Sequence, residues 1–147
     1  VSLYDRAPVP AVPDRTTAVA TPLADGDYWA ELVSVDAAAG TLTFDLAQAL
    51  FADACVEELG ADGCPNDYGV IDEPPLELVS PALSLASASV AAQSQQNYAV
   101  TADELIVLMS GTAPSADAPD TYAYVPFPFL VTVADGEVVQ ARQIWVP

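Results

Sequence analysis

The closing stretch of the chain, Phe127-Pro-Phe-Leu-Val-Thr-Val-Ala-Asp-Gly-Glu-Val-Val-Gln-Ala-Arg-Gln-Ile-Trp-Val146, carries the clearest folding signal in the sequence. Strand-forming residues run over 127–133 and again over 138–146. Between the two runs lies Ala134-Asp135-Gly136-Glu137, and an Asp-Gly pair in this position is typical of a tight β-hairpin. We therefore predict that the chain ends in a hairpin over residues 127–146.

A second hairpin is predicted closer to the N-terminus. Residues 28–35 (Tyr-Trp-Ala-Glu-Leu-Val-Ser-Val) favour a strand, and residues 36–40 (Asp-Ala-Ala-Ala-Gly) favour a turn. Residues 41–44 then alternate, with Leu42 and Phe44 on one face.

A helix is predicted directly after this hairpin. Asp45 stands where a helix N-cap would lie, and Gln48 follows three residues later, as in a capping box. Apolar residues then recur every three or four positions as far as Leu59. This spacing predicts an amphipathic helix over residues 45–59 that ends near Gly60.

The middle of the chain predicts shorter elements. In chain order these are strands at 68–71 and 76–79 interrupted by Pro74-Pro75, a strand at 83–91, a polar loop at 93–97, and a loop at 112–121. Residues 105–109 (Leu-Ile-Val-Leu-Met) suit either a helix or a strand. Because Thr101 and Glu104 form a capping box before them, we favour the helix.

The order of these elements predicts a mainly β (α+β) fold. We expect a twisted antiparallel sheet or a small barrel with one or two short helices at its edge or end. Residues 1–24 are rich in Pro, Ala, Val and Thr, a composition that favours extended backbone. The chain is therefore divided into an N-terminal arm or tether, 1–24, and a single β-rich domain, 25–147.

The charge of the chain restricts its partners. Its 147 residues contain 21 Asp and Glu against three arginines (Arg6, Arg15 and Arg142), which gives a net charge of −18. Binding to nucleic acid or to an anionic membrane surface requires Lys or Arg, so both are excluded. No apolar run approaches the roughly 20 residues that cross a bilayer, so no transmembrane segment is predicted.

The residues that are missing exclude most catalytic chemistry. Without histidine the chain cannot build a Ser-His-Asp or Cys-His nucleophile, and without lysine it cannot form a Schiff base. Carboxylate chemistry survives, either as an acid–base pair or as an oxygen-ligand cation site. We expect a protein that is not an enzyme and that needs no cofactor, with Ca²⁺ as the alternative.

The two cysteines, Cys55 and Cys64, are separated by a short loop. A metal site would need further soft ligands, which the chain lacks, whereas a disulfide suits an oxidising compartment. We predict a disulfide, and with it a protein that is secreted or associated with the cell envelope.

Two groups of residues are candidate binding sites. The acidic loop 62–72 offers oxygen ligands for Ca²⁺ or contacts for a basic partner, through Asp62, Asn66, Asp67 and Asp72. It lacks the spacing of an EF-hand, and a solvated helix face and loop is the simpler explanation. Tyr122, Tyr124 and Trp145 could form an interaction surface, or they could pack the core beneath the closing hairpin.

Several short motifs resemble a family of small exported proteins of high-GC bacteria, often lipoprotein-like, that has no assigned activity. The motifs are Asp25-Gly26-Asp27-Tyr28 with Ser34-Val35-Asp36 and 41–45, the Cys55 to Cys64 loop running into Asn66-Asp67-Tyr68, and Asp135-Gly136. The likeness covers residues 25–147. It implies the same disulfide, an exported location and a similar fold.

The chain departs from this family at Gly69 and Asp72, where the resemblance implies a second aromatic and a basic residue. From all these features we expect a non-catalytic, exported interaction or structural module with a protein partner, or one that self-assembles through its N-terminal arm. The alternative is a protein that binds Ca²⁺ or a basic partner through loop 62–72.

Overall fold

The two predicted hairpins form the centre of the fold. In the computed structural model, which describes residues 3–147, strands β2 (Gly26–Asp36) and β3 (Thr41–Phe51) make the first, and β7 (Phe129–Ala134) and β8 (Glu137–Gln143) make the second. Strand β2 also pairs with β7, which joins the hairpins into one sheet. Asp135 and Gly136 have φ angles of 52° and 77°, as a type I′ turn requires.

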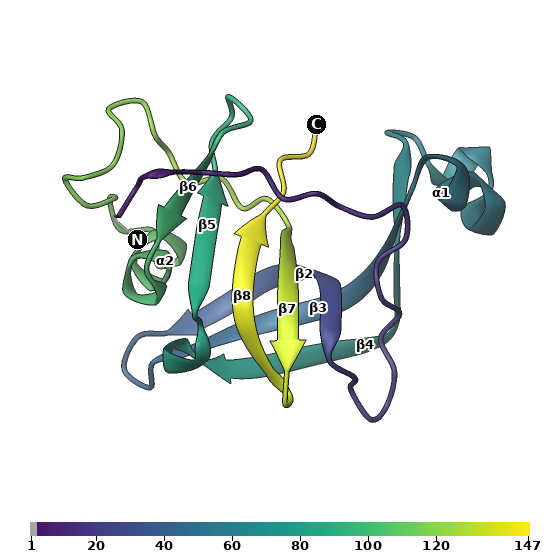
Figure 1. Cartoon of the computed structure of the whole chain (residues 1–147), viewed down its shortest axis with the longest axis horizontal. Coiled ribbons are helices and arrows are strands. Elements are labelled where there is room, and N and C mark those ends of the chain that lie inside the picture. Colours follow the sequence, from purple (N-terminus) through teal and green to yellow (C-terminus); the bar gives the residue numbers. More distant parts are fainter. Residues whose placement is uncertain (1–2) are drawn as a thin grey trace.

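Eight strands build the sheet, in the order β1-β6-β5-β8-β7-β2-β3-β4. The remaining strands are β1 (Arg6–Ala7), β4 (Tyr68–Pro81), β5 (Ser87–Ala91) and β6 (Asn97–Val100). Neighbours are antiparallel except β5 and β8, which are parallel. Figure 1 shows β2, β3 and β4 crossing β5, β7 and β8 at a steep angle, so the sheet is strongly bent.

The predicted fold class is confirmed. Strands account for 42% of the residues and helices for 15%, and over the described residues the twisted sheet stays open. Of the two architectures expected, the chain therefore adopts the sheet and not the closed barrel. The two short helices, α1 (Ala52–Leu59) and α2 (Ala102–Met109), lie at opposite ends of the view in Figure 1.

The predicted helix over residues 45–59 is wrong in its first half, because β3 continues to Phe51 and α1 begins only at Ala52. A bulge interrupts the pairing of β3 with β4 between Leu46 and Gln48. Leu46 packs between the two halves of the sheet, whereas Ala47 and Ala49 belong to a separate apolar cluster. A bulged strand that is buried on both faces has apolar residues at spacings that imitate a helix.

The two strands predicted at 68–71 and 76–79 are parts of one strand, β4, which passes through Pro74 and Pro75. Strand β4 lies at the edge of the sheet and pairs only with β3. An edge strand tolerates proline because its outer side needs no N–H donors. The pairing moves from Leu46 opposite Leu76 to Gln48 opposite Ile71, so residues 72–75 bulge out of the ladder.

The strand predicted at 83–91 is shorter than expected. A 3₁₀ turn, Ala82–Ser84, comes first, and Leu83 is fully exposed instead of lying on a strand face. The polar loop predicted at 93–97 ends one residue early, because Asn97 begins β6. Its buried amide donates to Ser89 Oγ at 3.0 Å and to the Gln143 carbonyl oxygen at 2.9 Å.

The predicted helix after Thr101 is confirmed as α2. The Thr101 hydroxyl oxygen accepts a hydrogen bond from the Glu104 backbone N–H at 3.1 Å, which caps the first turn. The other half of the predicted capping box does not form, since the Glu104 carboxylate accepts its hydrogen bonds from Tyr4 and Ser115. Residues 112–121 form a loop, as predicted.

Apolar side chains are buried on both faces of the sheet. The larger cluster fills the bend between its two halves and reaches under α2, with Tyr28, Phe44 and Phe129 wholly buried. A smaller cluster, centred on Trp29, is buried against Val12 of the N-terminal arm. The arm therefore covers part of a sheet face that would otherwise be open to water.

Candidate ligand cavity

Residues 3–24, the described part of the arm, lie along the sheet of the same chain. At one end the Tyr4 N–H donates to the Ala99 carbonyl oxygen at 2.6 Å, and β1 pairs with β6. Farther along, the Thr16 N–H donates to the Ala49 carbonyl oxygen at 3.0 Å, and the Ala49 N–H donates to Thr16 Oγ at 2.8 Å. Between these points the arm passes over β5 and β8 (Figure 1).

A buried hydrogen bond holds the start of the arm. The Tyr4 hydroxyl donates to Glu104 Oε2 at 2.6 Å, and both side chains are buried. The same oxygen accepts the Ser115 N–H at 3.0 Å. Burial, and then the bond to Glu104, raise the pKa of Tyr4 well above its usual range. Tyr4 is therefore a neutral donor to a buried carboxylate.

The arm forms one wall of a cavity of about 860 Å³, which is within the size range of small-molecule sites. Leu3 and arm residues 5–11 face β5, β6, the first residue of α2 and one residue of β8. The lining is largely apolar or small, including Leu3, Val9, Leu85 and Val100. Its open side is marked by lining residues that are exposed to solvent, such as Pro8 and Ser87.

Two of the three arginines line this cavity. Arg142, on β8, lies opposite Ser89 of β5, and its Nε atom is buried without a hydrogen-bond partner. Arg6, on β1, contributes from the arm side. The third, Arg15, forms an exposed ion pair with Glu58 at 3.3 Å, the one salt bridge among residues 3–147.

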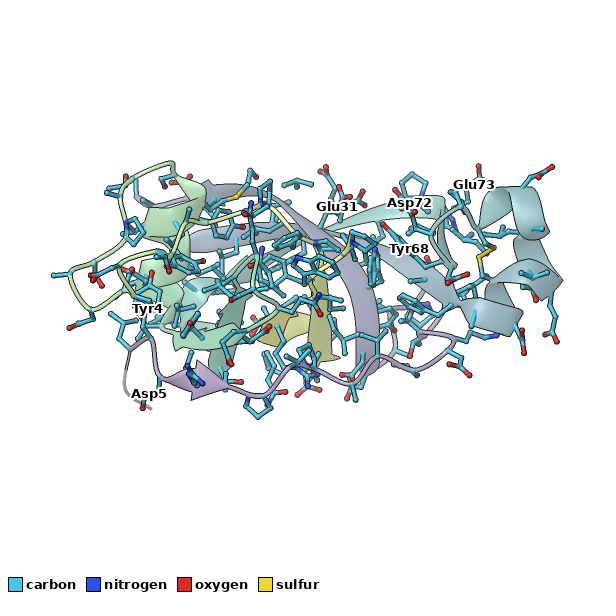
Figure 2. The ribbon with its side chains drawn as sticks, turned by 90° about the horizontal axis from the view of Figure 1, so that it is seen from above. Tyr4, Asp5, Glu31, Tyr68, Asp72 and Glu73 are labelled. Atoms are coloured by element: carbon cyan, nitrogen blue, oxygen red, sulfur yellow. A yellow bond between two sulfur atoms is a disulfide. The ribbon has the colours of Figure 1, made fainter. Side chains whose placement is uncertain are left out.

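Carboxylates gather elsewhere, on the sheet of β2, β3 and β4. Asp45 lies opposite Glu31 on one side and Glu77 on the other, and Asp72 approaches from the bulge of β4. Burial raises the pKa of Asp45, and the charges of Asp72, Glu77 and Glu31 raise it further. Figure 2 shows Glu31 and Asp72 on the side of the molecule opposite to Asp5 of the arm.

The four predicted cation-binding residues are exposed and are spread along the chain. Asp62 lies in the 3₁₀ turn Ala61–Gly63, Asn66 and Asp67 in the next turn, and Asp72 in the bulge of β4 beside Asp45. Asp67 has a φ of 63°, which suits a turn. Within residues 3–147 there is no group of three or more His, Cys, Asp or Glu side chains placed to hold a metal ion.

The predicted disulfide between Cys55 and Cys64 is confirmed, and it ties α1 to the turn that follows. Both cysteines are buried. At Gly69, a Cβ atom would lie 2.4 Å from Leu59 Cδ1 and 2.9 Å from the Gly63 carbonyl oxygen. Glycine is therefore required where the family resemblance implies an aromatic side chain.

The three predicted interaction aromatics do not form one surface patch. Tyr122 is buried, with its ring 5.4 Å from that of Tyr4 and 6.1 Å from that of Tyr98. Tyr124 is half-buried, and its hydroxyl contacts Met109 Sδ at 3.9 Å. Trp145 packs against Phe127, with ring centroids 6.4 Å apart.

Sequence reasoning missed the cavity. Arg6 and Arg142 are 136 positions apart, and the structure places both in one lining. The one available signal was the rarity of cationic residues in so acidic a chain, which makes the position of each arginine informative.

Comparison of the chain with family models, with curated proteins and with solved structures finds no match. The resemblance of residues 25–147 to small exported proteins stays a prediction. None of the helices in residues 3–147 has the length and apolar character to cross a membrane.

Proposed function

We propose that this chain is a non-catalytic binding module of an exported protein, and that it takes its ligand in the cavity beneath the N-terminal arm. The observation that carries the proposal is the cavity itself, about 860 Å³ in volume, mostly apolar, and lined by two arginines of a chain that has only three. Pockets that combine an apolar lining with a few polar groups are typical of small-molecule sites.

The polar groups of the lining support binding rather than catalysis. The Thr101 hydroxyl oxygen accepts the Glu104 N–H, and the Ser89 hydroxyl oxygen accepts from the Asn97 amide. A nucleophilic hydroxyl needs an adjacent base, and the chain has no histidine or lysine to serve as one. The disulfide supports export, because such bonds persist in oxidising compartments.

The contacts of the arm support a role in the cavity wall, and the alternative is that the arm joins subunits. Tyr4 and Thr16 form their hydrogen bonds within their own chain. Light scattering on the intact protein distinguishes the two roles. A monomer at high concentration agrees with an arm that lines its own cavity, and a stable oligomer favours self-assembly.

The proposal is tested with N-phenyl-1-naphthylamine, a neutral dye that fluoresces in apolar surroundings. Ala86 lies in the lining, so Ala86→Trp adds an indole to the wall of the cavity. Ala86 is also exposed, so the substitution does not enlarge a buried side chain. We expect this variant to bind the dye at least about tenfold more weakly than the unmodified protein. Ala116→Trp is the matched control, because Ala116 is an exposed residue of the loop over 112–121 and lies outside the lining.

Equal binding by all three proteins would place the dye elsewhere and contradict the proposal. A lack of binding to any of them would contradict it as well. Melting temperatures of both variants, measured alongside, establish that loss of binding does not come from loss of folding.

A further inference from the structure

Resting on the proposed function, we infer that the ligand of this cavity carries a single anionic headgroup, a carboxylate or a phosphate, on an apolar body. Arg142 and Arg6 would contact the headgroup, and the apolar walls would contact the body.

Arg142 is a partly buried cation that lacks a carboxylate partner. Its neighbours across the ladder are Ser89 and Leu130, neither of which carries a charge. Its Nε atom is shielded from solvent and makes no hydrogen bond. Removing a cation from water is costly unless an anion compensates for the lost hydration. An anion held in the cavity would provide that compensation.

Arg6 adds a second positive charge from the arm side of the same cavity. Guanidinium groups bind carboxylates and phosphates through pairs of hydrogen bonds, which gives such contacts both strength and orientation. Asp5 is the carboxylate of the lining, and Figure 2 places it at the outer margin of the arm. The lining therefore has a net charge of +1 in a protein whose net charge is −18.

The charge of the whole protein does not prevent anion binding at this place. At physiological ionic strength, exposed charges are screened over about 8 Å. The carboxylates around Asp45 lie on the sheet of β2, β3 and β4, whereas the cavity is bounded by β1, β5, β6 and β8. Contact with two guanidinium groups can therefore outweigh the remote repulsion.

The rest of the cavity suits an apolar body rather than a sugar or a nucleotide. Leu3, Val9, Leu85 and Val100 offer methyl groups, and Ala86 and Ala88 leave space between them. Polar ligands bind through many directed hydrogen bonds, and this lining offers few such groups. A ligand with one charged end and one apolar end matches this combination of cationic and apolar lining residues.

A pair of dyes that share one ring system tests the inference. 1-Anilinonaphthalene-8-sulfonate carries one negative charge, and N-phenyl-1-naphthylamine has the same rings without it. Both are titrated into the intact protein at about 0.15 M salt, where remote charges are screened. We expect the anionic dye to bind roughly tenfold more tightly than the neutral one.

Substitution of single arginines locates the headgroup. Arg142→Gln and Arg6→Gln should each weaken the anionic dye by about tenfold and leave the neutral dye nearly unchanged. Arg142→Lys, which keeps the charge and loses the guanidinium, should lie between the unmodified protein and Arg142→Gln. Arg15→Gln is the control, because it changes the net charge equally and lies outside the cavity.

Displacement of the bound dye identifies the headgroup. Decanoate and decyl phosphate should displace bound 1-anilinonaphthalene-8-sulfonate, and decanol should need a concentration about tenfold higher to do so. Tighter displacement by decanoate assigns a carboxylate, and tighter displacement by decyl phosphate assigns a phosphate.

The failure of the inference differs from the failure of the proposed function. If Ala86→Trp abolishes binding of both dyes but the glutamine variants bind the anionic dye normally, the cavity is a binding site and anion recognition is wrong. If Ala86→Trp changes the binding of neither dye, the site itself is wrong and both proposals fall.

Discussion

The hydrogen bond between Tyr4 and Glu104 allows a quantitative prediction about the arm. Tyr4→Phe removes one hydroxyl and leaves the buried Glu104 carboxylate with one hydrogen-bond donor among the described residues, the Ser115 N–H. A hydrogen bond to a charged group contributes about 1.5–3 kcal/mol. We therefore expect a loss of about 2 kcal/mol, which in a chain of this length lowers the melting temperature by about 4–8 °C.

The assay is thermal unfolding followed by circular dichroism at pH 7. Tyr124→Phe is the matched control, since the Tyr124 hydroxyl makes only a long contact with Met109 Sδ, at 3.9 Å. This variant should melt within about 1 °C of the unmodified protein. If Tyr4→Phe melts no earlier than Tyr124→Phe, the bond does not hold the arm and the reasoning fails.

Three further predictions concern the disulfide and the titrating groups. Replacing Cys55 and Cys64 together by Ala should cost about 2.5–3 kcal/mol in urea unfolding, because it opens a loop whose ends are nine positions apart. Asp45→Asn should stabilise the protein at pH 7 by on the order of 0.5 kcal/mol, since it removes a carboxylate that three others repel. The pKa of Tyr124 is raised to about 12 and that of Tyr122 further, so stability should hold below about pH 10 and fall as the pH rises above it.

Each of these has a defined contrary result. Unchanged urea unfolding of the double alanine variant would mean that the disulfide adds nothing. Because the pKa of Asp45 is raised in the folded protein, this carboxyl does not destabilise the fold below the ordinary carboxyl pKa, where it is protonated. The protein loses stability as the pH rises through the pKa that Asp45 has in the folded state. Asp45→Asn should therefore gain nothing at pH 3, and Asp120→Asn, at an exposed loop position, should gain nothing at either pH. A flat stability between pH 9 and about pH 11.5 would contradict the tyrosine prediction.

The elements that were predicted correctly are those whose signals are local. A type I′ turn needs positive φ at both central positions, and Asp135 and Gly136 are residues that adopt positive φ readily. The turn could therefore be predicted from these two residues alone. Helix α2 forms because Thr101 caps its first turn. The disulfide follows from two cysteines nine positions apart with no competing soft ligands.

The errors arise where tertiary structure decides. Residues 45–51 have helical spacing because a bulge and burial on two faces disturb the alternation of a strand. Pro74 and Pro75 do not end β4, because the strand lies at the edge of the sheet. Strand β6 is short, and its first residue is a polar Asn97 whose partners come from β5 and β8.

The candidate site could not be predicted because its walls come from distant parts of the sequence. Arg142 meets residues 3–11 only after the arm has folded across the sheet. The acidic loop was predicted as a binding site because its carboxylates are close in sequence, yet Asp72 lies beside Asp45 of another strand. Nearness in sequence is a poor guide to a site whose walls come from the N-terminal arm and from strands far from the arm in the sequence.

The central claim is that the cavity under the arm binds an amphipathic anion, and nuclear magnetic resonance of the ¹⁵N-labelled protein titrated with decanoate tests it most directly. We predict that the largest shifts fall on the amides of residues 5–7, 87–89 and 99–102 and on the Arg142 Nε–H. Shifts confined to residues 52–73, or no shifts at all, would contradict the claim.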